Sequence, residues 1–97
     1  MAKGYWVACV NVKNQDEFKK YVDLAGPAVN SHDGKFLVRG DKVFNIEGKK
    51  YQRIVVSVFD SPEKAKECYK SKEYQHALSF LNDDVAERII HIAEGLD

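Results

Sequence analysis

Apolar positions along the chain follow two spacings, one typical of strands and one typical of helices. β-Branched and aromatic residues, which favour strands, are concentrated in four short segments. We predict a strand in each of them: residues 5–12, 35–39, 51–59 and 88–93. Gly40 and Asp41 predict a bulge or tight bend after the second segment, with alternation resuming at residues 43–46.

Helical spacing begins after residue 14. Asn14 offers an N-cap and Glu17 follows three residues later, which is the capping-box arrangement. Apolar residues then recur on one side of a predicted amphipathic helix: Phe18, Tyr21, Val22 and Ala25. Gly26 and Pro27 interrupt this pattern, because proline lacks an N–H group and disfavours helix in the residue before it. We therefore expect a kink there, or a restarted turn that ends by residue 31.

A second helical region follows the third strand. Ser61 can cap it, Pro62 suits the first helical position and Glu63 complements the helix dipole. Ser71 offers a cap for a second short helical piece, which ends in the polar run at residues 82–84. The predicted order is β-α-β-β-α-β, the ferredoxin-like pattern of an antiparallel sheet with helices on one face.

The predicted strands are apolar on both faces. In residues 5–12 the odd and even positions are both mainly apolar, and the same holds for residues 54–59 and for the last strand. A face exposed to water would alternate with polar residues, so these strands are expected to be covered twice. Because two helices cover only one face, we predict a homodimer in which two copies of the sheet pack together.

Composition limits the function classes. The chain has 97 residues, with 15 Lys and Arg against 15 Asp and Glu, which predicts one domain over residues 1–97 without the basic excess of a nucleic-acid-binding protein. No apolar stretch approaches the roughly 20 residues of a transmembrane helix, and the start lacks the zones of a signal peptide. We therefore predict a cytoplasmic location, with neither nucleic acid nor membrane as a partner.

Familiar catalytic and cofactor motifs are absent from the sequence. It has no dinucleotide or phosphate loop, no nucleophile elbow and no His-Glu-x-x-His pair. Its three histidines lack the spacing of metal ligands, so we predict neither a metal nor a cofactor. Cys9 and Cys68 stand far apart and are interpreted as buried free thiols.

The sequence resembles a family of small bacterial proteins, the domain of unknown function 1330, within the dimeric α+β barrel group. The matching segments are residues 3–6 (KGYW), 26–28 (GPA), 34–40 (GKFLVRG), 59–65 (FDSPEKA), 68–75 (CYKSKEYQ) and 94–95 (EG). The resemblance covers nearly the whole chain, and it implies the ferredoxin-like fold and a dimer. Many family members carry an arginine near the position of Phe80 and Leu81, so this chain has lost or relocated that group.

The resemblance implies no reaction, because the family is uncharacterised. Relatives with the same dimeric barrel include cofactor-independent monooxygenases, isomerases and dehalogenases that act on small organic molecules. That is an analogy at the level of the fold, which by itself does not assign a function.

Arg39 is the polar residue that is hardest to explain structurally. It shares a parity with Leu37 in an apolar strand, and its planar guanidinium suits a carboxylate or an enolate. The alternative is a buried or interfacial ion pair with Asp33, Asp41 or Glu73.

Two functions follow from these residues. The first is a pocket for a small acidic or enolic molecule between sheet and helices, lined by Trp6, Arg39, Tyr69, Tyr74 and His91, with Arg53 beside Arg39. If this pocket is catalytic, His91 or His32 would transfer a proton without a cofactor, or the chemistry would be of the oxygenase type. The alternative is a non-catalytic dimeric ligand sensor or accessory module.

Overall fold

Four strands and three helices follow one another in the order β-α-β-β-α-α-β. The computed structural model describes residues 2–97. Its elements are β1 (Gly4–Val12), α1 (Gln15–Ser31), β2 (Lys35–Gly40), β3 (Arg53–Phe59), α2 (Pro62–Lys70), α3 (Lys72–Leu78) and β4 (Ala86–Glu94). The predicted ferredoxin-like order is confirmed, with the second helical region in two pieces as expected.

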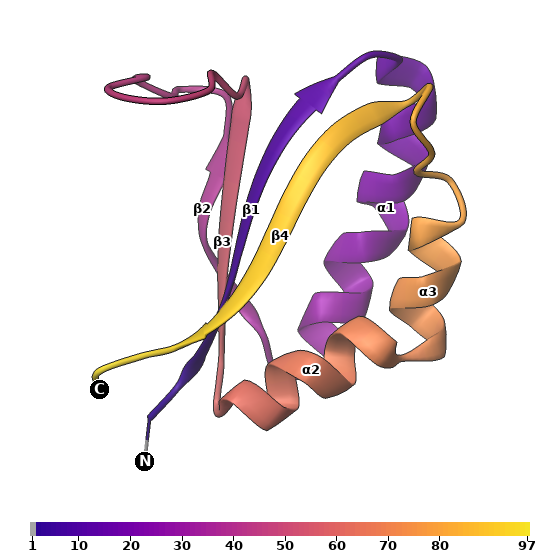
Figure 1. Cartoon of the computed structure of the whole chain (residues 1–97). Coiled ribbons are helices and arrows are strands. Elements are labelled where there is room, and N and C mark those ends of the chain that lie inside the picture. The colour runs from indigo at the N-terminus through magenta and orange to yellow at the C-terminus, as the bar shows by residue number, and fades with distance from the viewer. Residues whose placement is uncertain (1) are drawn as a thin grey trace.

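The strands form one antiparallel sheet in the order β2-β3-β1-β4, and the helices lie on one face of it (Figure 1). The central strand β1 pairs with β3 on one side and with β4 on the other. In β2 the register shifts between Phe36 and Val38. Of the two alternatives predicted at Gly40 and Asp41, the bend is confirmed, because the chain bends at Asp41 directly after β2 ends, whereas the irregularity of the ladder lies inside the strand.

The predicted caps of the helices are confirmed. The Asn14 Oδ1 accepts a hydrogen bond of 3.2 Å from the Glu17 N–H. Ser61 Oγ accepts one of 3.1 Å from Lys64, and Ser71 Oγ accepts one of 3.2 Å from Tyr74. These bonds satisfy amide groups that the first turn of a helix leaves unpaired.

Helix α1 continues through Gly26 and Pro27, so the alternative of a separate, restarted turn is wrong, and the helix ends at Ser31, as expected. The turn around the proline buries Ala28 and Val29 almost completely, at 2% and 1% exposed. Burial of this apolar turn outweighs the loss of one helical hydrogen bond, and the ring of Pro27 itself lies on the exposed side.

Residues 41–52 form an extended connection rather than the predicted continuation of a strand, and the connection projects beyond the sheet (Figure 1). Phe44 and Ile46, which alternate like strand residues, are 84% and 89% exposed. The third strand begins at Arg53 instead of Tyr51 because the Asn11 side chain replaces the next rung of the ladder. Its Oδ1 accepts from the Gln52 N–H at 2.8 Å, and its Nδ2 donates to the Lys50 carbonyl at 3.1 Å.

The core lies between the helices and the sheet. Its largest members that are fully buried are Phe59, Tyr74, Val29 and Cys68. Trp6 packs against this group, and its indole Nε1 donates to the Ala65 carbonyl at 3.0 Å. The buried thiol predicted for Cys68 is confirmed, and burial raises its pKa to about 12, with Glu73 adding to the rise. Cys9 is only half-buried.

No helix within residues 2–97 covers the other side of the sheet, which we call the open face (Figure 1). Strand register places these residues on it: Tyr5, Val7, Cys9, Asn11, Lys35, Val38, Ile54, Val56, Val58, Glu87, Ile89, His91 and Ala93. Most are apolar, and Val38 and Ile89 are 48% and 44% exposed. The two-sided apolar pattern predicted for the strands is therefore present, with one side left uncovered in a single chain.

Candidate functional site

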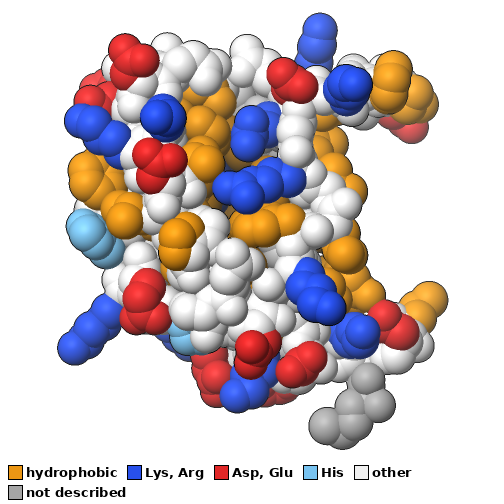
Figure 2. Space-filling view, turned by 180° about the vertical axis from the view of Figure 1, so that it is seen from behind, with side chains coloured by type: hydrophobic (Ala, Val, Ile, Leu, Met, Phe, Trp, Pro, Cys, Tyr) orange, Lys and Arg blue, Asp and Glu red, His pale blue; other side chains and the backbone are white. Residues whose placement is uncertain are grey.

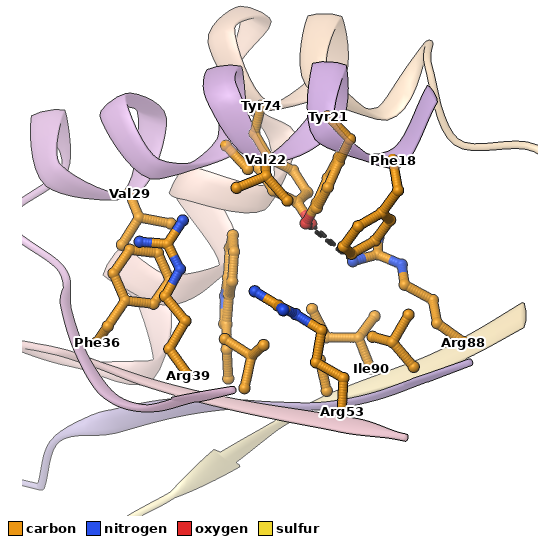
Figure 3. A pocket seen from close by; sticks show the side chains of 15 residues that line it. Phe18, Tyr21, Val22, Val29, Phe36, Arg39, Arg53, Tyr74, Arg88 and Ile90 are labelled. Carbon is orange, nitrogen blue, oxygen red and sulfur yellow. Dashed lines mark hydrogen bonds between the residues drawn. The ribbon is translucent and has the colours of Figure 1, made fainter. Parts of the chain in front are cut away.

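A pocket lies between α1 and the helix-facing side of the sheet (Figure 3). Helix α1 packs against α3, and bulky side chains fill the space between α1 and the strands. The pocket has a cavity volume of about 40 Å³ and fifteen lining residues. Nine of these have purely hydrocarbon side chains: Ala8, Val10, Phe18, Val22, Ala25, Val29, Phe36, Val55 and Ile90.

Three arginines line this pocket, one from each of three strands. Arg53 of β3 and Arg88 of β4 both pair with Val10 of the central strand, which places their Cα atoms roughly 10 Å apart at ordinary strand spacing. Arg39 of β2 pairs with Val55, two residues along from Arg53. Figure 3 shows Arg39 at one end of the pocket, Arg88 at the other and Arg53 between them.

The positive charges of this pocket lack acidic partners. Among residues 2–97, no carboxylate lies within salt-bridge distance of any of the three guanidinium groups. Arg39 instead stacks over the Phe36 ring at 4.2 Å, and Arg53 faces the Phe18 ring at 5.6 Å. Figure 2 shows Lys and Arg side chains lying over hydrophobic ones at the centre of one face.

Arg39 is placed differently from the sequence-based expectation. It shares a side with Phe36, not with Leu37, because the register shift in β2 reverses the parity between them. The structure pairs it with none of the three acids considered, and Glu73 contacts His32 instead. Arg39 is exposed at the rim of the pocket, with its Nη2 3.5 Å from the position that a Cβ on Gly26 would occupy.

Arg88 forms a hydrogen-bonded group with two tyrosines, which we call the Arg88 group. Arg88 Nη1 donates to the hydroxyl oxygens of Tyr21 at 3.1 Å and Tyr74 at 3.0 Å. The two hydroxyl oxygens lie 2.7 Å apart and share a further hydrogen bond. Burial raises the pKa of Tyr74 well above its ordinary value, so this phenol is neutral at physiological pH.

Sequence reasoning missed the Arg88 group, although a signal for one member was present. Arg88 alternates with Ile90 and Ile92 in an apolar strand, the same kind of signal that singled out Arg39. Tyr21 was assigned only to the apolar stripe of the first helix. Its contact with Tyr74 spans 53 residues, and no local pattern predicts such a contact.

Four of the predicted ligand-binding residues line the pocket: Trp6, Arg39, Arg53 and Tyr74. Tyr69 does not. It packs on the core side of Trp6 and Tyr74, with ring centroids 6.1 and 5.3 Å away. The expectation that Tyr69 belongs to the same pocket is therefore wrong, because α1 and Tyr74 of α3 supply the helical side of the lining and α2 supplies none of it.

The expectation that His91 lines this pocket is also wrong. His91 follows Ile90 by one position in β4, so its side chain lies on the open face, opposite the arginines. His32, the other histidine proposed for proton transfer, caps the C-terminus of α1, and its Nε2 lies 3.3 Å from Glu73 Oε2. The fifteen lining residues include no histidine, carboxylate or lysine.

The rest of residues 2–97 adds no second chemical centre of a familiar kind. That part of the chain holds no group of three or more His, Cys, Asp or Glu side chains arranged to bind a metal. Nor does it contain a helix that is both long enough and apolar enough to cross a membrane.

The sheet topology and the one-sided helix layer define a ferredoxin-like α+β protein. The model of a domain of unknown function, DUF1330, matches residues 3–96. The chain belongs to this family, so the resemblance seen in the sequence is confirmed. No curated protein matches the chain.

Solved structures support the same fold. RPA0582, a protein of unknown function from Rhodopseudomonas palustris, is 13% identical with a TM-score of 0.77, over 99% of this chain and 84% of that one. SnoaB, a cofactor-independent oxygenase from Streptomyces nogalater, is 10% identical with a TM-score of 0.67, over 96% and 92%. A dimeric ferredoxin-like protein of unknown function from Thermobifida fusca is 12% identical with a TM-score of 0.56, over 96% and 91%.

Proposed function

We propose that this protein binds a small organic acid, as a carboxylate or an enolate, in the pocket between α1 and the sheet. The observation that carries the proposal is the set of three arginines that face an apolar cavity without an acidic partner among residues 2–97. Cations next to apolar surface lose hydration, and the aromatic rings and tyrosine hydroxyls that face these arginines compensate that loss only in part. An anionic ligand supplies the missing charge.

The polar groups of the pocket favour an acceptor-rich ligand. They are three guanidinium groups, two tyrosine hydroxyls and the Trp6 indole, whose N–H is already bonded to Ala65. Guanidinium groups present N–H donors in a fork that fits a carboxylate. The nine hydrocarbon side chains of the lining suit an apolar body, so the ligand class is a small acid with a hydrophobic skeleton.

The cavity must open to admit such a ligand. Its volume of about 40 Å³ is well below the roughly 150 Å³ of an apolar cavity that binds benzene. Arg39 and Arg53 are the side chains free to move, because neither hydrogen-bonds to another of the residues 2–97 and Arg39 is exposed. We expect both guanidinium groups to swing toward solvent and close on the carboxylate.

Titration calorimetry with cinnamate, an aromatic carboxylate, tests this proposal. Arg39→Met and Arg53→Met should each weaken binding about tenfold, the equivalent of about 1.4 kcal/mol for a lost charged hydrogen bond. Lys66→Met is the matched control, because Lys66 is exposed on α2 and its loss removes the same charge away from the pocket. The absence of cinnamate binding, or equal affinity in all variants, would contradict the proposal.

We further propose that two copies of the chain pair through the open face. The support is the apolar character of that face and the neighbour from Thermobifida fusca, which is described as dimeric. Exposed apolar surface of this kind is typical of interfaces. Sedimentation velocity at micromolar concentration should give twice the chain mass of 11.1 kDa. A stable monomer would rule out this pairing.

Cofactor-independent oxygenase chemistry is a second candidate function. It is favoured by the fold shared with SnoaB and by the tyrosine hydroxyls and Arg88 beside an apolar cavity. Since histidine is missing from the lining, proton transfer in this pocket would run through tyrosine or through the substrate. Oxygen uptake with an acid that binds in calorimetry would support it. Binding without turnover would favour the non-catalytic ligand-sensing role.

A further inference from the structure

The Arg88 group holds one hydroxyl proton that has no acceptor among residues 2–97. Tyr21 and Tyr74 each carry one hydroxyl proton, and their shared bond of 2.7 Å uses one of the two. Arg88 donates to both oxygens and accepts from neither, because a guanidinium has no acceptor site. One O–H donor is therefore left over.

The spare proton belongs on Tyr21. Both tyrosines line the cavity (Figure 3), but Tyr74 is fully buried, whereas Tyr21 is only half-buried. An unpaired donor costs more in the dry position, so Tyr74 donates to Tyr21 and the proton of Tyr21 faces the cavity. In this arrangement the Tyr21 oxygen accepts from both Arg88 and Tyr74, which fills its two lone pairs.

The count of donors and acceptors in the Arg88 group also disfavours a ligand whose neutral hydroxyl would contact Tyr21 and Arg88. A hydroxyl on the ligand needs an acceptor for its proton, and the side chains that line the pocket offer no carboxylate, histidine or amide. The Tyr21 oxygen is already saturated by its two donors, and the Tyr74 oxygen, which accepts only from Arg88, belongs to a side chain that is fully buried. An ionised oxygen, in contrast, accepts from Tyr21 and from the N–H groups that Arg88 has left.

We propose that the Arg88 group is an oxyanion site, which binds the ionised phenolic or enolic oxygen of a ligand whose carboxylate is held by Arg53 and Arg39. This inference rests on the proposed function and narrows its ligand class to hydroxyaromatic or enolic acids. In such a ligand the carboxylate and the second oxygen lie at opposite ends of an apolar body. Two negative charges then lie among three guanidinium groups. The proton lost by the ligand passes to bulk water, because the lining holds no carboxylate or imidazole to take it.

Spectroscopic titration of 4-hydroxycinnamate tests the oxyanion site, since its phenolate absorbs at longer wavelength than its phenol and away from the protein. In the wild-type complex the phenol pKa should fall by at least one unit, a tenfold change in ionisation. Affinity for 4-hydroxycinnamate should then rise about tenfold per pH unit between the bound and free phenol pKa values, while affinity for cinnamate stays flat.

Two variants and one control complete the test. Arg88→Met should abolish the pKa shift, and Tyr21→Phe should at least halve it, because the remaining hydroxyl, 2.7 Å from that of Tyr21, belongs to the fully buried Tyr74. Tyr51→Phe removes a hydroxyl outside the pocket and should leave the shift intact.

The outcomes separate this inference from the proposed function. A loss of 4-hydroxycinnamate affinity in Tyr21→Phe at least tenfold larger than its loss of cinnamate affinity supports the oxyanion site. The oxyanion site is overturned if the phenol pKa is unshifted in the wild-type complex, or if Arg88→Met and Tyr21→Phe both retain the shift. In either case, binding of cinnamate would still support the carboxylate pocket. Failure of both acids to bind overturns the pocket itself.

Discussion

The two faces of the sheet are built from neighbouring residues of the same strands, yet they differ sharply in charge. The helix-facing side carries three arginines among apolar side chains, whereas the charged residues of the open face, Lys35 and Glu87, lie on the outer strands β2 and β4. Adjacent positions of β4, Ile90 and His91, lie on opposite sides. Apolar character alone therefore does not separate a binding pocket from an association surface.

What separates the two faces is whether the uncovered groups need a charged partner. Burial of an apolar surface against any other apolar surface is favourable because it removes both from water, and a second copy of the chain provides such a surface. Guanidinium groups in an apolar cavity need acceptors and negative charge. We therefore place the proposed self-association on the open face and the proposed anionic ligand on the helix-facing side. Each of the two proposals can be tested separately.

The largest effect is expected from a charge placed at the middle of the open face. Val56 pairs with Val7 and Val38, so Val56→Lys puts an ammonium group at the centre of the proposed interface. An unpaired buried charge costs about 3–5 kcal/mol, which raises the dimer dissociation constant roughly a thousandfold. Sedimentation equilibrium measures it. Asn30→Lys, exposed on α1, adds the same charge and should leave the dimer unchanged. A dimer that persists in Val56→Lys would show that the interface lies on another part of the molecule.

An intermediate effect is expected from a methyl group added beneath α1. A Cβ on Gly34 would lie 2.6 Å from Phe59 Cε2 and 2.7 Å from Val29 Cγ1. Overpacking of this kind costs about 1–3 kcal/mol, so Gly34→Ala should lower the free energy of unfolding in denaturant by that amount. Gly40→Ala is the control, because a Cβ there meets nothing within 4 Å. Equal stability of the two variants would show that Phe59 and Val29 can shift to accommodate the added methyl group at little cost.

The smallest effect is expected at His91. The residue lies across the sheet from the arginines, so His91→Gln should change the affinity for cinnamate by less than twofold. Arg53→Met in the same calorimetric assay provides the scale, with an expected tenfold loss. A loss of similar size in His91→Gln would place the histidine in the ligand site and remove the distinction between the faces.

Local chemistry determined the elements and their order. The caps at Asn14, Ser61 and Ser71 depend on side chains within three residues of the amides that they bind, so the sequence contains all the information they need. Strand positions and the two-sided apolar pattern also follow from the sequence. Pro27 shows where this fails, because burial of the helix turn against distant residues overrides a local preference.

Only the tertiary structure decided which side chains meet. Parity in the sequence places Arg88 and His91 on opposite faces, but both faces are apolar, so the pattern does not say which one the helices cover. The shift of register in β2 moved Arg39 to the side of Phe36. The Arg88 group joins Tyr21, Tyr74 and Arg88 across three elements. Such contacts depend on how α1 and α3 pack over the sheet, and this packing is set by the whole core and not by any one segment.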